Sequence, residues 1–157
     1  MNALADRFRF NEQLLAVATE GFAADDWSRA PSEQGGNTAH WILGHVALAR
    51  RGLLRKLGVE VPVEAWEDHF QRGGTPDAAA AYPAPAELIA DLAANGERLS
   101  ERLPSLSEVE RGAEWGTAFP DGSTTVAGGA HFLYFHETYH LGQIGLLRRI
   151  CGKPGFV

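Results

Sequence analysis

One segment, from about residue 123 to 150, constrains the fold more than any other part of the chain. Between residues 132 and 147 it is apolar on nearly every side, which is typical of a helix buried among other helices. Gly152 and Pro154 follow it and are residues that end helices. We therefore expect a long fourth helix here, and we expect it to be the most buried one.

Three other segments carry apolar residues at the spacing of three and four that lines one face of a helix. Thr38 or Asn37 is a suitable N-cap for the second segment, and Pro85 suits the first position of the third, which Pro104 should end. Connections of about residues 59–84 and 105–122 follow these two helices. The predicted helices span residues 2–22, 38–58, 85–103 and 123–150.

This pattern predicts an all-α four-helix bundle with long connections after its second and third helices. The chain has 157 residues, which fits a single domain over residues 1–157. No apolar run reaches the length of a membrane span, and no signal-peptide core is visible near the N-terminus. We therefore expect a cytoplasmic protein without a membrane partner.

Charge and composition narrow the function. Lys and Arg number 14 against 20 Asp and Glu, and a net charge of −6 disfavours binding to nucleic acid. The single cysteine, Cys151, excludes a disulfide framework and a cysteine-based zinc site. Six histidines remain, so any metal should be held by imidazoles and carboxylates.

The strongest motif is the pair His136 and His140 in the fourth helix. Histidines four residues apart lie on one helical face and can direct their ring nitrogens to one metal ion. The sequence H-E-T-Y-H also matches the H-E-x-x-H motif of zinc proteases. However, Gln143 and Leu146 stand where a metzincin has Gly and His, and residues 141–157 hold no further His, Asp or Glu. We therefore expect the third ligand upstream and no protease.

His45 in the second helix is the upstream candidate. It lies beside the apolar stripe, where an unpartnered imidazole is costly, so it either bonds a backbone carbonyl or joins the other two histidines. We expect it to be the third metal ligand, with an open coordination position as in catalytic sites. His40, His69 and His131 are expected to be bystanders, with His69 the most able to approach the metal.

Three neighbours of these histidines are candidates for further roles. Gln143 shares their helical face and should bond a ligand histidine, water or substrate, unless it is a satisfied core amide. Trp41 lies in the same row as His45 and is a candidate for contact with substrate or with that histidine. Glu137 at the flank is a candidate general base, with an inter-helix or surface carboxylate as the alternative.

Three segments together resemble the DinB/YfiT-like superfamily of metal-dependent proteins. They are NTAHWILGHVALARR, WEDHFQRGGTP and FHETYHLGQIGLLRRICG, and with the helix order the resemblance covers nearly the whole chain. It implies an up-down-down-up bundle, a homodimer, and metal ligands at His45, His136 and His140.

The resemblance also implies a function. We expect a metal-dependent transferase that joins a low-molecular-weight thiol cosubstrate to a small electrophile. The alternatives are a metal-dependent hydrolase and a non-enzymatic metal-binding or dimeric bundle. Zinc or nickel is the favoured ion, and iron or manganese is also compatible with imidazole ligands. An anionic thiol would need cations, which could come from Arg50, Arg51, Arg55 and Lys56.

Overall fold

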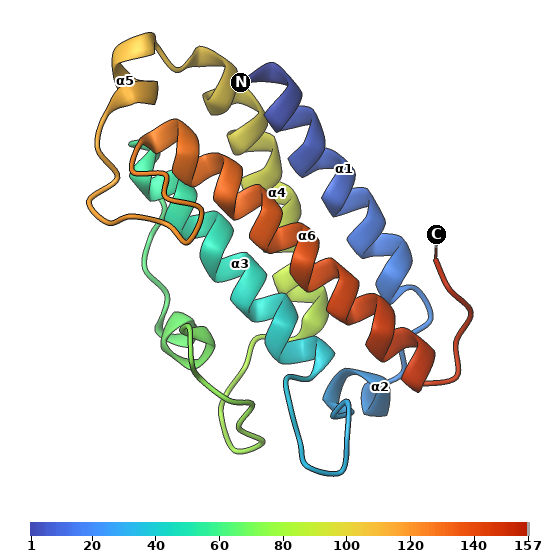
Figure 1. The fold of residues 1–157 in the computed structure, drawn as a ribbon. Coiled ribbons are helices and arrows are strands. Elements are labelled where there is room, and N and C mark those ends of the chain that lie inside the picture. Colours follow the sequence, from blue (N-terminus) through green and yellow to red (C-terminus); the bar gives the residue numbers. More distant parts are fainter. Residues whose placement is uncertain (157) are drawn as a thin grey trace.

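A computed structural model, which describes residues 1–156, shows four long helices packed as a bundle (Figure 1). Short helices interrupt the connections between them, and residues 1–156 contain isolated β-bridges but no strand. The all-α four-helix architecture is confirmed. The long helices are α1 (Asn2–Thr19), α3 (Ala39–Lys56), α4 (Pro85–Ser105) and α6 (Val126–Ile150). The short ones are α2 (Ala24–Ser28), the 3₁₀ helix η1 (Ala65–Phe70) and α5 (Glu108–Gly112).

In chain order, the four long helices run up, down, down and up (Figure 1). Each of α1 and α3 packs against both α4 and α6. Helices α1 and α6 run in the same direction, and so do α3 and α4 (Figure 1). Because α3 and α4 are parallel, the crossover segment, residues 57–84, must return along the length of the bundle. The connection from α1 to α3 lies at one end of the bundle, and the connection from α4 to α6 lies at the opposite end (Figure 1).

Helix boundaries follow the capping signals, with two differences from expectation. The Thr38 side chain caps α3 by accepting a hydrogen bond from the backbone of Trp41 at 3.2 Å. Helix α1 ends at Thr19 rather than near residue 22, because Gly21 turns the chain with φ +73°. Pro104 lies inside the last turn of α4, which continues to Ser105, rather than beyond the helix.

The core consists of two apolar clusters separated by polar residues. One cluster lies around Ile42, Leu92 and Ile144, and the other around Leu53 and Leu99. On each long helix a buried polar position falls between the two clusters in sequence. These positions are Asn11, Arg50, Asn95 and Glu137, and we call them the polar layer.

Burial differs from the prediction for the fourth helix. The most buried helix is α3 rather than α6, because the crossover segment and η1 cover the side of α3 that α4 and α6 leave open. On α6 the side chains of Phe135, Tyr139 and Leu146 are each more than half exposed. The apolar character of α6 therefore continues onto the surface. No helix within residues 1–156 is both long enough and apolar enough to cross a membrane.

Candidate metal centre

His45 of α3 and His136 and His140 of α6 meet where the two helices pack. The Nε2 atom of His136 lies 3.1 Å from Nε2 of His45 and 3.1 Å from Nε2 of His140. Each ring offers one ligand nitrogen, and these three nitrogens all lie within 4.8 Å of one another. The structure thus brings together the three histidines that the sequence singled out.

The crossover segment orients His45. Its Nδ1–H donates to the carbonyl oxygen of Phe70, the last residue of η1, at 2.7 Å. Gly44 makes this contact possible, because a Cβ there would lie 2.4 Å from the Phe70 ring. The Trp41 indole stacks on the His45 imidazole at 5.0 Å and anchors the same segment by donating to the His69 carbonyl. Trp41 therefore supports His45 directly and also lines the site.

Gln143 orients His140 from within α6. Its Oε1 accepts a hydrogen bond from Nδ1–H of His140 at 2.7 Å, and its Nε2 donates to the Tyr139 hydroxyl at 3.2 Å. In this orientation of the amide the oxygen of Gln143 faces the imidazole, so the ring nitrogen that faces Gln143 is the protonated one. An outer hydrogen bond of this kind holds a metal-binding histidine in one tautomer.

These contacts determine where the ring lone pairs point. Since Nδ1 carries the proton in both His45 and His140, their Nε2 lone pairs are directed at the shared centre. Burial lowers the pKa of His136 to about 3 and that of His140 to about 4, and it lowers the pKa of His45 as well. All three imidazoles are neutral at pH 7, which is the form that binds metal.

The hydrogen-bonding capacity of His136 is not satisfied by the protein alone. A single Nε2–H could be shared with its two neighbours, but Nδ1 is buried and has no hydrogen-bond partner. With the other tautomer, three lone pairs would face one another. A divalent cation removes this conflict, and two of the three separations, at 3.1 Å, are close to the edge of about 3.3 Å expected for nitrogens around tetrahedral zinc. The three residues therefore fit a metal ion, and within residues 1–156 no carboxylate or thiol joins the group.

The centre opens into a pocket of about 260 Å³, which we call the metal pocket. Its rim includes two polar residues that the sequence analysis missed, Asn37 and Arg72. The Arg72 charge adds to the effect of burial in lowering the pKa of His136, so it acts on the site. The only sequence signal for this role was Gly73–Gly74, a turn signature that exposes the preceding residue.

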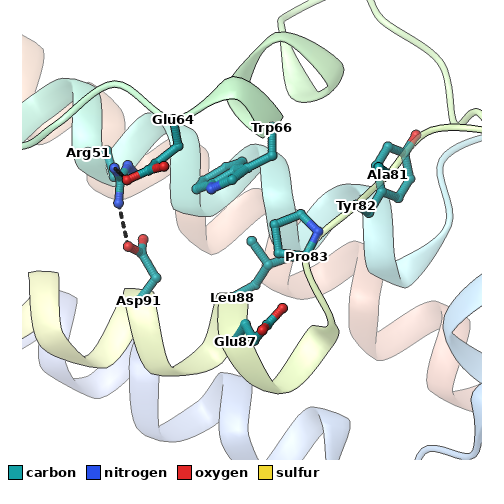
Figure 2. A pocket seen from close by; sticks show the side chains of 9 residues that line it. All are labelled: Arg51, Glu64, Trp66, Ala81, Tyr82, Pro83, Glu87, Leu88 and Asp91. Carbon is teal, nitrogen blue, oxygen red and sulfur yellow. Dashed lines mark hydrogen bonds and ion pairs between the residues drawn. The ribbon is translucent and has the colours of Figure 1, made fainter.

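The cations expected to attract an anionic thiol lie elsewhere. Arg51 and Arg55 pair with the buried carboxylate of Glu67, and Lys56 donates to a backbone carbonyl. Arg51 also reaches a second pocket of about 460 Å³, where it pairs with Asp91 (Figure 2). Arg51 and Arg55 are thus paired with carboxylates, and none of these three cations lines the metal pocket.

Glu137 also lies outside the histidine group. Its carboxylate accepts hydrogen bonds from Arg50 at 2.7 and 3.3 Å within the polar layer. Burial raises the pKa of Glu137 although the Arg50 charge opposes this shift. The contacts correspond to the inter-helix alternative considered from the sequence, and a general-base role finds no support in this geometry.

The other three histidines do not join the centre. His40 contacts the carbonyl oxygen of Pro83 through Nε2 at 2.8 Å, and His131 is exposed. His69 packs its ring against Tyr82 and contributes only its backbone carbonyl, which accepts from Trp41.

The bundle topology and the three converging histidines define a helical protein with a candidate metal centre. The sequence profile of the DinB superfamily matches residues 7–144, and the chain therefore belongs to this superfamily. Among solved structures, its fold is similar to that of YfiT from Bacillus subtilis, described as a probable metal-dependent hydrolase with an unusual four-helix bundle topology. The two share 18% identity over 97% of this chain and 87% of that one, with a TM-score of 0.71. No curated protein matches the sequence.

Proposed function

We propose that the protein is a metal-dependent enzyme in which His45, His136 and His140 hold one divalent ion. The observation that carries this proposal is the convergence of three Nε2 atoms, of which Phe70 orients that of His45 and Gln143 that of His140. Zinc or nickel suits three neutral imidazoles, and iron or manganese is also compatible. Such an ion would supply Lewis acidity, which lowers the pKa of a coordinated thiol or water.

The reaction proposed first is transfer of a low-molecular-weight thiol to a small electrophile. The support is an absence of carboxylates among the described residues that line the metal pocket, together with the Arg50 contacts of Glu137. A thiolate needs no carboxylate base once its proton has left, whereas an attacking water is usually assisted by one. Hydrolysis is the second candidate, and the likeness to YfiT favours it.

Metal analysis tests the proposal. We expect the wild-type protein to retain about one divalent ion after extensive dialysis, and His45→Ala, His136→Ala and His140→Ala to retain far less. His40→Ala is a matched control on α3 outside the histidine group and should keep its metal. Full metal content in the three variants would contradict the assignment, and the absence of metal from the wild type at every ion tested would contradict the function.

Assays of the loaded enzyme separate the two reactions. Thiol transfer predicts that turnover of an electrophile depends on thiol concentration and stops when thiol is omitted. Turnover of an ester or amide without any thiol would instead support the hydrolase.

We also propose that the chain forms a homodimer in the cytoplasm. The apolar side chains of Phe135 and Tyr139 are each more than half exposed on α6, and a second copy of the chain would cover them. The single, half-buried cysteine is compatible with a reducing compartment. Sedimentation of the wild type should give the mass of a dimer, and Phe135→Glu should give a monomer. A monomeric wild type would contradict the dimer.

A further inference from the structure

A tight turn places Arg72 at the rim of the metal pocket. It follows η1 in a tight turn, in which the Gly74 N–H donates to the Gln71 carbonyl at 2.9 Å. Gly73 has φ +83°, the conformation of the third residue of a type II turn. Gly74 lies against both the turn and the Trp41 ring, so this turn is packed on the residue that supports His45.

The guanidinium of Arg72 is not used by the fold. Within residues 1–156 it takes part in no hydrogen bond or ion pair, and it is the only charged side chain that lines the metal pocket. Arg50, Arg51 and Arg55, by contrast, each have at least one carboxylate partner. A cation that the protein leaves unpaired beside its reactive centre is available to a ligand.

Another pocket, distinct from the one beside Arg51, adjoins the metal pocket. It has a volume of about 290 Å³ and apolar walls from Pro31, Ile42 and Leu147. Asn37 lines both pockets, and the hydrogen bond between His140 and Gln143 joins their walls. An apolar compartment therefore lies directly beside the cationic rim of the metal pocket.

We propose that the substrate is a small carboxylate with an apolar tail, whose anionic group binds Arg72 and whose tail occupies the pocket beside Ile42. A guanidinium matches a carboxylate with two parallel hydrogen bonds. A single arginine on an acidic protein favours a monoanion over a doubly charged phosphate. This inference rests on the proposed function, because it assigns the substrate class of the same site.

Binding of hexanoate, measured by calorimetry on the zinc-loaded protein, tests the anionic end. We expect Arg72→Met to weaken hexanoate by about tenfold, as loss of a charge-assisted hydrogen bond predicts. Arg72→Lys should weaken it less, because it keeps the charge without the planar fork. Arg111→Met on α5, at the far end of the bundle, is the matched control and should bind as the wild type does. Hexanamide, which is uncharged, should be unaffected by Arg72→Met.

Chain length tests the apolar end. From acetate to butyrate to hexanoate, the affinity should rise by about fourfold for each added CH₂ group that is buried. Equal affinity of acetate and hexanoate would overturn the tail assignment, and equal affinity of the wild type and Arg72→Met for hexanoate would overturn the anion assignment. Inorganic phosphate binding more tightly than hexanoate would overturn the monoanion.

Carboxylate binding by Arg72 and metal binding by the histidines can be tested separately. Zinc content is measured on the same samples, and Arg72→Met should retain its metal because Arg72 is not a ligand. If the wild type holds no metal, the proposed function fails, while the same titrations on the chelator-treated protein still decide whether Arg72 binds the carboxylate.

Discussion

The three histidines differ in how the chain supports them. His45 depends on a backbone carbonyl from a remote segment, and His140 on a side chain one turn away. His136 has no partner at Nδ1, so its orientation depends on packing and on the ion itself. Removing either outer hydrogen bond should therefore reduce metal affinity without removing a ligand.

Gln143→Leu tests this dependence in α6. The change keeps a side chain of similar size but removes the acceptor for Nδ1–H of His140. Zinc affinity should therefore fall about 10- to 100-fold. Competition with a chromophoric chelator gives the affinity. Gln13→Leu on the exposed face of α1 is the control, and it should have no effect. Unchanged affinity in Gln143→Leu would mean that this hydrogen bond does not contribute to binding.

Gly44→Ala tests the support of His45. The added Cβ would meet the Phe70 ring at 2.4 Å, so the ring and the carbonyl beside it must move. We expect a loss of about 1–3 kcal/mol in unfolding free energy together with weaker metal binding. Gly52→Ala lies on the same helix with no atom within 4 Å, and it should stabilise the protein by about 0.5–1 kcal/mol. Urea titrations measure both variants, and equal effects would contradict the steric argument.

At the scale of elements, η1 is held in place by one buried carboxylate. Glu67 accepts from Arg51 at 2.8 Å and also pairs with Arg55, and it is 3% exposed. Burial by itself would raise the pKa of Glu67, but the ion pairs with Arg55 and Arg51 outweigh it and the pKa is lowered. The pairs thus join α3 to the segment that supplies the Phe70 carbonyl.

Glu67→Gln should cost about 1–3 kcal/mol in unfolding free energy at pH 7, because Arg55 loses its carboxylate partner and the buried Arg51 loses one of its carboxylate partners. A lowered pKa means that the carboxylate stabilises the fold above its unfolded pKa of about 4.5, and that this contribution disappears as the pH falls through the folded value. The difference between wild type and variant in urea midpoint should shrink below pH 4.5. A difference that stays constant from pH 7 to pH 3 would rule out this origin. Glu64→Gln, at a half-exposed carboxylate near the same arginine, is the control.

At the scale of the whole molecule, Arg50 connects all four long helices. It belongs to α3 and donates to Glu12 of α1, to the Leu92 carbonyl of α4 and to Glu137 of α6. Gly96 makes room for this contact, because a Cβ there would lie 2.1 Å from the Glu12 carboxylate. The polar layer therefore sets the register between helices, which two apolar clusters alone would specify less sharply.

Arg50→Met should destabilise the bundle by about 3–5 kcal/mol, because Glu137 would remain buried without a cation. Arg50→Met combined with Glu137→Gln should recover part of the loss, since no buried charge is then left alone. Thermal and urea unfolding of the single and double variants measure the difference. A double variant that is less stable than Arg50→Met would show that Glu137 does not need this partner.

The sequence alone predicted the four long helices and singled out the three histidines, and it missed helix ends by two or three residues. Helical spacing places His136 and His140 on one face whatever the rest of the chain does, and residues 141–157 contain no further His, Asp or Glu. The sequence could not decide the roles of Arg50 and Glu137, because a charged residue within a helix looks the same in the sequence whether it faces solvent or a partner on another helix. The tertiary structure placed them in the polar layer.

The tertiary structure also decided which residues surround the candidate metal. Phe70 and Arg72 come from a crossover segment without a regular pattern, and only its return along the bundle brings them to the histidines. The physical reason is the range of the interactions: local periodicity reports contacts within a helix, whereas a carbonyl or guanidinium from a loop reaches the site through packing between distant segments.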